Sequence, residues 1–261
     1  MPHVLSRDRT PIAFESFGDG PSVILVVGAF NTRSTGTPLA QALASHLRVF
    51  TYDRRGRGDS GDTPPYAVER EIEDLAALIR EADGSAAVFG YSSGALLALR
   101  AAAQGLPITR LALYDPPYLV GAPQAQPSVD HAARLAELVA SGRRGDAVEY
   151  FQGQMVKIPP EIVTQLRQAP FRPALEAMAH TLVYEAIILG DQSLPTDLVE
   201  AVTMPTLVAA GGASPSMRAA ADALAAALPQ GDAHVLEGVG HDLDPAVLGP
   251  VLEAFLAPGL A

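Results

Sequence analysis

Two kinds of hydrophobic pattern alternate along the chain. Short runs of branched apolar residues, such as 23–27, are typical of strands buried on both faces, and we predict strands at 12–17, 23–27, 49–52, 86–91, 111–114, 206–210 and 233–236. Between them, apolar side chains recur at spacings of three and four, as at Ile72, Leu75 and Ile79. This spacing predicts amphipathic helices at 38–47, 67–82, 93–103, 217–227 and 245–256. The alternation predicts an α/β fold with a mostly parallel central sheet flanked by helices.

The alternation stops in residues 119–203, which carry helical signals and no strong strand signal. Prolines and glycines, among them Pro123, Pro127 and Gly142, separate helices predicted at 129–141, 146–156, 160–168 and 173–189. We therefore predict a core formed by residues 1–118 and 204–261, with a helical insertion at 119–203 between two core strands.

The composition narrows the class of protein. Of the 261 residues, 48% are hydrophobic, which is enough to build a folded core. The net charge of −11 argues against a nucleic-acid partner and weakly against an anionic membrane. The absence of cysteine excludes disulfides, thiolate catalysis and zinc–thiolate sites. Residues 1–8 lack the apolar core of a signal peptide, and no apolar run reaches the roughly 18–20 residues of a membrane span, so we expect a cytoplasmic protein.

The run Gly90-Tyr91-Ser92-Ser93-Gly94 matches G-x-S-x-G, the pattern of a nucleophile elbow. A predicted strand enters it and a predicted helix leaves it, as the elbow requires. Glycines two residues before and after the serine remove Cβ atoms that would clash in so sharp a turn. The pattern therefore predicts Ser92 as a nucleophile beside the positive end of a helix, and the competing interpretation is a serine that caps this helix.

Three segments resemble the α/β-hydrolase superfamily and follow the superfamily's order along the chain: the loop 52–60 with the sequence Tyr-Asp-Arg-Arg-Gly-Arg-Gly-Asp-Ser, the elbow, and the late segment 238–242 with Gly-Val-Gly-His-Asp. The resemblance spans nearly the whole chain. It implies the α/β-hydrolase fold, serine-hydrolase chemistry, and a lid where the helical insertion is predicted.

A serine nucleophile needs a base, and the chain offers His3, His46, His131, His180, His234 and His241. His241 follows the last predicted strand in a glycine-rich loop, where the site of an α/β protein is built. His234 lies inside that strand, and the others fall on the predicted surface or in the insertion. We predict His241 as the base.

The third group should orient the histidine and stabilise its charged form. Many members of the superfamily carry this acid after the strand that follows the lid, but here residues 211–215 contain no carboxylate, and the nearest is Asp222 inside a predicted helix. Asp115, at the end of the strand after the nucleophile helix, is the position that we favour. Its competing role is to start a turn before two prolines. A third arrangement is a Ser92–His241 dyad with water or Ser214 in place of the acid.

An oxyanion hole would complete the site. One donor should be the backbone N–H of Ser93, and the other the N–H of Ala29 or, less favoured, Phe30, in the loop after strand 23–27. Val27 stands where the family often has histidine, while the following Gly28 is kept. The charged loop around Asp53, Arg54, Arg55, Arg57 and Asp59 is interpreted as scaffold rather than as chemistry.

The sequence thus predicts a serine hydrolase with Ser92, His241 and Asp115 as its triad and a carboxylic ester or lactone as its substrate. Two alternatives stay open: a lyase or cyclase on the same scaffold, and a binding protein that has lost turnover. No metal cluster or dinucleotide loop is visible, so we expect no cofactor and no metal. The expected partner is a small-molecule substrate, without nucleic acid or membrane, and the sequence leaves the oligomeric state open.

Overall fold

The computed structural model describes residues 1–121 and 129–257. Within them, contacts divide the chain into two units, a core of residues 1–121 and 192–257 and a helical unit of residues 129–191. The insertion was expected over 119–203, of which residues 122–128, with Pro123 and Pro127, lie outside the described residues. Its role as a lid stays a prediction. No helix of the described residues is long and apolar enough to cross a lipid bilayer.

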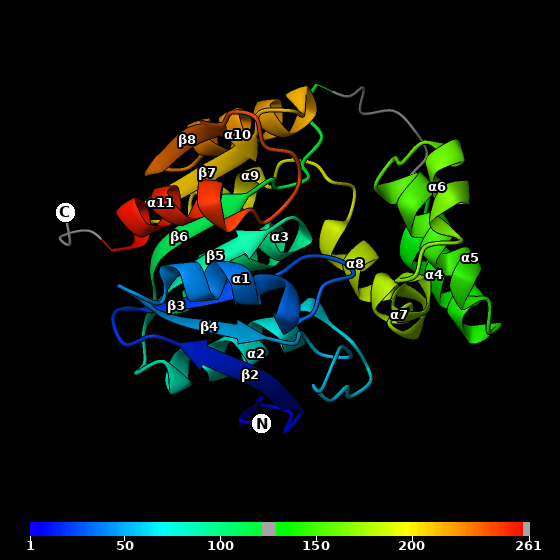
Figure 1. Ribbon diagram of the computed structural model, residues 1–261, viewed down its shortest axis with the longest axis horizontal. Coiled ribbons are helices and arrows are strands. Elements are labelled where there is room, and N and C mark those ends of the chain that lie inside the picture. Colours follow the sequence, from blue (N-terminus) through cyan, green and yellow to red (C-terminus); the bar gives the residue numbers. More distant parts are fainter. Residues whose placement is uncertain (122–128, 258–261) are drawn as a thin grey trace. The chain divides into compact units, whose positions relative to one another are not determined.

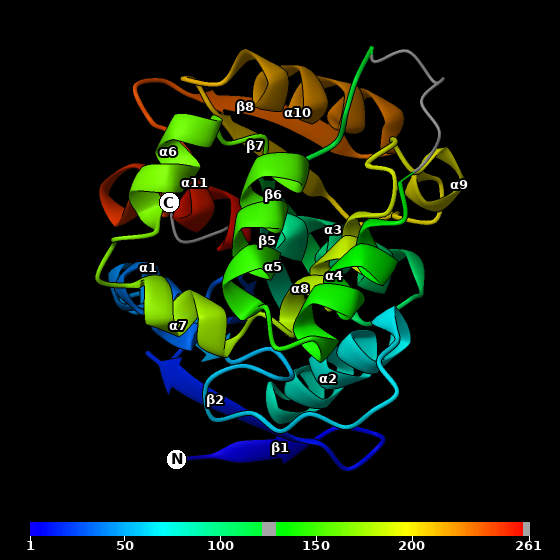
Figure 2. The ribbon, with the colours of Figure 1, turned by 90° about the vertical axis from the view of Figure 1, so that its right-hand side faces the viewer.

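The core is built on a sheet whose strands follow the order β1-β2-β4-β3-β5-β6-β7-β8. Its strands are β1 (His3–Leu5), β2 (Pro11–Phe17), β3 (Ser22–Val26), β4 (Arg48–Tyr52), β5 (Ala86–Tyr91), β6 (Ile108–Tyr114), β7 (Thr206–Gly211) and β8 (Gly231–Leu236). The pairings β1–β2 and β2–β4 are antiparallel and the others are parallel. Figure 2 shows β1 and β8 at opposite edges of the sheet. The predicted mostly parallel sheet is confirmed.

Helices cover both faces of this sheet. The core helices are α1 (Arg33–Leu43), α2 (Val68–Glu81), α3 (Ser93–Ala103), α9 (Thr196–Val199), α10 (Pro215–Ala227) and α11 (Pro245–Leu256). Helices α1 and α11 pack on each other and, with alternate residues of the strands, form one buried apolar cluster. Helix α3 contacts α2 and α9, and Figure 1 shows α1 in front of the strands and α3 behind them. Because strand side chains alternate between faces, the sheet has an apolar layer on each side.

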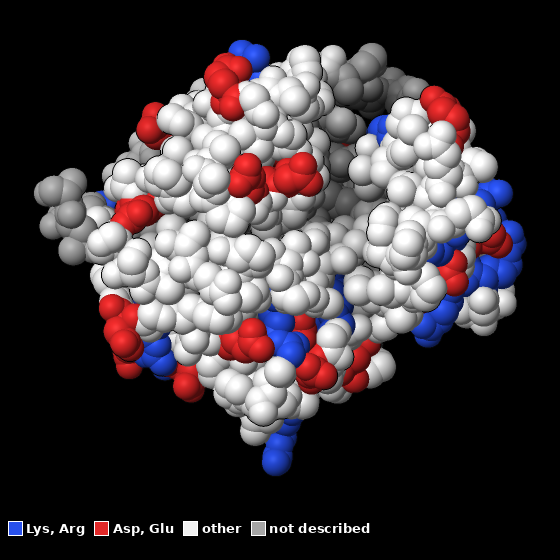
Figure 3. Space-filling model, viewed as in Figure 1, with Lys and Arg blue, Asp and Glu red and all other residues white. Residues whose placement is uncertain are grey.

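The helical unit consists of α4 (His131–Ala140), α5 (Arg144–Tyr150), a π-helical turn η1 (Phe151–Met155), α6 (Pro160–Leu166), α7 (Arg172–Ala177) and α8 (Thr181–Leu189). Its buried Arg172 joins α7 to α5, because it donates to Glu176 of its own helix at 2.6 Å, and to the carbonyl of Gly145 at 2.7 Å and the carboxylate of Glu149 at 3.2 Å in α5. Acidic and basic side chains lie in mixed groups on the face of the protein that Figure 3 shows.

Leu119 and Gln192, core residues that precede and follow the helical unit in the sequence, are joined by a hydrogen bond. The N–H of Leu119 donates to the carbonyl of Gln192 at 2.8 Å, and Nε2 of Gln192 donates to the carbonyl of Pro117 at 3.1 Å. Gln192 has a φ of 59°, in the left-handed region. The chain therefore leaves the core after β6 and returns to it at the same place.

Three sequence predictions need correction. The helix expected at 38–47 begins at Arg33 and ends at Leu43, because Asp53 accepts a hydrogen bond from the N–H of Arg33 at 2.8 Å and so caps the helix from a distant loop. The helix expected at 173–189 is two helices, α7 and α8. Between them the hydroxyl of Thr181 donates a hydrogen bond to the carbonyl of Met178 at 2.8 Å. Strand β1 and helix α9 were not predicted, and both are short.

Candidate active site

Ser92 lies on the sharp turn that the elbow pattern predicts. It stands between β5 and α3 with φ 56° and ψ −126°, a backbone conformation that is strained for a residue with a side chain. Its side chain makes no capping hydrogen bond to α3. Ser92 therefore stands at the N-cap position of α3 without using its hydroxyl as a cap, and that hydroxyl stands beside the positive end of an 11-residue helix.

Glycines let the backbone close around this serine. A Cβ on Gly90 would lie 2.6 Å from the Cα of Ala95, so the elbow has no room for a side chain there. A Cβ on Gly28 would lie 2.8 Å from Cβ and 3.3 Å from Oγ of Ser92. The loop after β3 therefore packs directly against the serine, although the two are far apart in the sequence.

Asp115, at the end of β6, meets His241, in the loop between β8 and α11. Nδ1 of His241 lies 2.7 Å from Oδ2 of Asp115, and the N–H of Gly211 donates to Oδ1 of the same carboxylate at 2.9 Å. Because an ionised carboxylate only accepts, the Nδ1–H of His241 is the donor, which leaves Nε2 as the acceptor of the ring. Asp115 is 1% exposed and has a φ of 49°, so a second strained residue stands next to the elbow.

Ser92 and His241 are not joined directly: among the described residues, Oγ of Ser92 makes no hydrogen bond to the imidazole. They are neighbours through Tyr91, whose ring centroid lies 4.9 Å from that of His241. Such contacts are often loose in a protein without its ligand and tighten when the substrate binds.

The other candidates for base and acid lie elsewhere. His234 is exposed on β8, and Asp222 is exposed on α10. Ser214 caps α10 by accepting from the N–H of Met217 at 3.4 Å. Of the acids considered from the sequence, the structure brings Asp115 to His241.

The two candidate oxyanion donors lie on either side of the serine. Ser93 is the first residue of α3, and Ala29 follows Gly28 in the loop that packs on Ser92. Within the described residues, neither N–H donates a hydrogen bond to the protein. The loop is fixed locally, because Nδ2 of Asn31 donates to the carbonyl of Ala29 at 2.7 Å and Phe30 takes a φ of 61°.

The charged loop after β4 holds the backbone at the end of β3, next to Ser92. Buried Arg57 donates to the carbonyl of Gly28 at 2.7 Å. Arg54 donates to the carbonyl of Val27 at 3.3 Å and forms a bidentate pair with Glu71 at 2.7 and 2.8 Å. Burial opposes the charge of Glu71, but the pairing with Arg54 outweighs it and lowers the pKa of the carboxyl. The scaffold interpretation of this loop agrees with these contacts.

Two residues of the site were missed from the sequence. Tyr91 and Tyr114 place their hydroxyl groups on the backbone of the loop that carries His241. The signal that could have identified them is their position, since each directly precedes a predicted site residue at the end of a strand.

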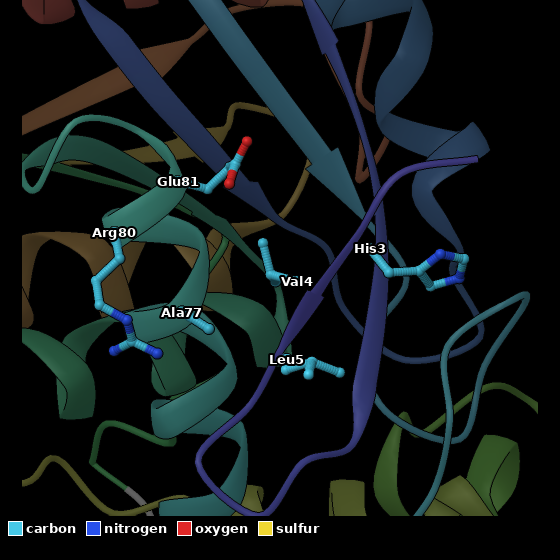
Figure 4. Close-up of a pocket in the computed structure, with 6 residues that line it drawn as sticks. All are labelled: His3, Val4, Leu5, Ala77, Arg80 and Glu81. Atoms are coloured by element: carbon cyan, nitrogen blue, oxygen red, sulfur yellow. The ribbon is translucent and has the colours of Figure 1, made fainter.

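A hollow of about 290 Å³ lies far from this site, at the edge of the sheet, and is lined by residues of β1 and α2 (Figure 4): His3, Val4, Leu5, Ala77, Arg80 and Glu81. It contains none of the predicted site residues. Among residues 1–121 and 129–257, no group of three or more His, Asp or Glu side chains is arranged to hold a metal ion.

Comparisons with known proteins bear on the family and the fold of the chain. A model of the Alpha/beta hydrolase family matches residues 23–249. The crystal structure of an alpha/beta hydrolase from Sphaerobacter thermophilus is 54% identical, covers 97% of this chain and 99% of its own, and superposes with a TM-score of 0.91. A thermophilic esterase from Thermogutta terrifontis, with malate bound, is 25% identical over 97% and 94% of the two chains, with a TM-score of 0.70.

A partial relative is N-formylmaleamate deformylase from Pseudomonas putida, which is 36% identical over 115 residues. The match covers 42% of this chain and 43% of that protein, so the chain spans less than half of its length.

Proposed function

Because the chain belongs to the alpha/beta hydrolase family, we propose that it is a serine hydrolase that cleaves a small carboxylic ester or lactone through an acyl-enzyme intermediate. The observation that carries the proposal is the 2.7 Å contact of His241 with buried Asp115 at the strand end next to Ser92. The contact fixes one imidazole nitrogen on the acid and leaves the other to take a proton.

In the proposed reaction, Nε2 of His241 takes the proton of Ser92 as Oγ attacks the substrate carbonyl. Asp115 stabilises the resulting imidazolium, and the N–H groups of Ala29 and Ser93 hold the developing oxyanion. The imidazolium then protonates the leaving oxygen as the bond breaks. Water, deprotonated by the same histidine, hydrolyses the acyl-enzyme and restores the serine.

The strain at the site supports this assignment. Phe30, Ser92 and Asp115 each have a positive φ, and together they carry the oxyanion loop, the nucleophile and the acid. Such conformations cost of order 1–3 kcal/mol each and concentrate where function requires them.

An amide-like substrate is a second candidate, favoured by the 36% identity to a protein named for the removal of a formyl group from N-formylmaleamate. The same acyl transfer would serve it, with a nitrogen as leaving group. A panel that includes esters, lactones and N-formyl amides separates the two candidates by their relative kcat/KM.

The first experiment is labelling with a fluorophosphonate probe, followed by peptide mass spectrometry. We expect an adduct on Ser92 that heat denaturation, Ser92→Ala and His241→Ala each abolish. Ser45→Ala is the control: it makes the same chemical change at an exposed serine between α1 and β4 that has no proposed role in the site. This variant should label at the wild-type rate.

Product analysis in ¹⁸O-labelled water distinguishes hydrolysis from lyase or cyclase chemistry. A hydrolase incorporates one solvent oxygen into the released acid. Failure of the folded protein to label at Ser92, together with no turnover of the panel, would overturn the proposal in favour of a binding protein.

A further inference from the structure

The two tyrosines that the sequence analysis missed stand side by side in the sheet. Tyr91 and Tyr114 are register partners in the parallel pairing of β5 with β6. Each is the last residue of its strand and directly precedes a site residue, Ser92 or Asp115. Partners in register point to the same face, and accordingly the two rings stack, with centroids 5.9 Å apart and planes 21° apart.

Their hydroxyl groups reach consecutive carbonyls of the base loop, defined here as residues 238–242. The hydroxyl of Tyr114 donates to the carbonyl of Gly240 at 2.6 Å, and that of Tyr91 donates to the carbonyl of His241 at 2.5 Å. Burial, reinforced by the negative charge of Asp115, raises the pKa of both phenols. Both hydroxyls are therefore protonated donors at neutral pH.

Within residues 1–121 and 129–257 few other hydrogen bonds hold the base loop, although the side chain of Val239 is buried in the apolar cluster of the core. The side chain of His241 is 46% exposed, so packing against neighbouring side chains restricts its position only in part. Besides the bonds to the two phenols and Asp115, a further hydrogen bond among the described residues runs from the N–H of Ala213 to the carbonyl of Val239 at 3.2 Å.

We propose that Tyr91 and Tyr114 are positioning residues that hold the backbone of the base loop, so that His241 keeps Nδ1 on Asp115 and presents Nε2 to Ser92. This inference rests on the proposed function, whose base is His241. One strand register then sets three things at once: the nucleophile at the end of β5, the acid at the end of β6, and the base above the tyrosine pair. A displacement of about 1 Å at a catalytic group can cost about 100-fold in rate, so two short hydrogen bonds to the backbone of the base matter.

The test compares Tyr91→Phe, Tyr114→Phe and the double variant, which remove the hydroxyl and keep the stacked rings. We expect each single change to lower kcat about fivefold and the double change about 30-fold, with KM within about twofold of the wild type, because the two hydroxyls bind the backbone of the base loop and have no proposed contact with the substrate. Tyr52→Phe is the matched control: its hydroxyl is buried on β4 without a hydrogen-bond partner among the described residues, and its loss should leave kcat unchanged.

A second readout does not depend on turnover. In protein labelled with ¹⁵N-histidine, the Nδ1–H of His241, assigned by its loss in His241→Gln, should exchange slowly in the wild type and broaden or vanish in the double variant. Thermal unfolding checks that the variants are folded, and the single variants carry the test if the double variant is not. A wild-type kcat, or a wild-type Nδ1–H signal in the double variant, would overturn the inference. If the wild-type protein neither reacts with the fluorophosphonate probe nor turns over the substrate panel, the proposed function is refuted instead. The Nδ1–H signal then still shows whether Tyr91 and Tyr114 position His241.

Discussion

Replacing Asp115 by asparagine tests the site most directly, since the surrounding contacts dictate how the new side chain must sit. The N–H of Gly211 donates to Oδ1 of Asp115 and therefore requires an acceptor at that position. In Asp115→Asn, the amide oxygen keeps this place and the NH₂ group replaces Oδ2, facing Nδ1 of His241. Because an NH₂ group only donates, the imidazole must accept at Nδ1 and carry its proton on Nε2.

The rate should fall far more than the stability. With its proton on Nε2, His241 cannot take the proton of Ser92, and the loss of this tautomer in a serine triad costs about 10⁴ in kcat, or about 5.5 kcal/mol of barrier. The φ of 49° at position 115 lies in the region that asparagine tolerates best after glycine, so the backbone is not strained further. Loss of one charged hydrogen bond to a half-exposed histidine should cost about 1 kcal/mol, which lowers Tm by roughly 2–4 °C.

The assay measures kcat on the best ester of the substrate panel and Tm by calorimetry. Asp222→Asn is the control, since it makes the same chemical change at the exposed carboxylate on α10 that the sequence also offered. We expect it to keep the wild-type kcat. The reasoning is refuted if Asp115→Asn keeps more than about a tenth of the wild-type kcat. In that case a dyad is the better description, and Ser214→Ala is the variant to examine next.

Three further predictions concern Gly28, which packs on Ser92, and the ionic contacts of Glu71 and Asp8. Gly28→Ala places a Cβ 2.8 Å from that of Ser92, so we expect kcat to fall at least tenfold and the free energy of unfolding by about 1–3 kcal/mol, measured by ester turnover and urea unfolding. Glu71→Gln leaves the buried guanidinium of Arg54 without its charged partner and should cost about 3–5 kcal/mol in urea unfolding, whereas a cost under 1 kcal/mol would show that the pair is dispensable. Burial opposes the charge of Asp8, but its hydrogen bonds lower the pKa of the carboxyl from an ordinary 3.8 to about 2. The stability it contributes is therefore complete above pH 3.8 and lost as the pH falls toward 2; Asp8→Asn should flatten acid unfolding in that interval, as followed by circular dichroism, and an unchanged curve would contradict this.

Local patterns predicted the centre of the sheet well. The run 23–27 and the strand–elbow–helix segment around Ser92 lie where the sequence put them, because each is determined by neighbouring residues: branched apolar side chains in one case, glycines at a sharp turn in the other. Asp115 was predicted as the acid from the order of the elements and the family resemblance, and the structure places it beside the elbow because the end of β6 lies next to the end of β5 in the parallel sheet.

Long-range contacts were the part that sequence could not supply. The start of α1 depends on Asp53, which is 20 residues away in the chain, and Pro38 looked like a first helical residue although it lies inside the helix. The bonds of Tyr91 and Tyr114 span 150 and 126 residues to the base loop. No pattern of neighbouring residues encodes such partners, and only the register of two strands brings the tyrosines together.

The clasp formed by Pro117, Leu119 and Gln192 makes the helical unit an exchangeable module. Because Leu119 and Gln192, core residues before and after the insertion, are joined by a 2.8 Å hydrogen bond, the core itself holds together the points where the chain leaves after β6 and returns toward β7. The entropy of closing such a loop grows only with the logarithm of its length, by about 0.6 kcal/mol for each doubling. Insertions, deletions or a replacement of the whole segment can therefore accumulate there at little cost to the sheet, which lets the protein change one of its parts while the rest stays fixed.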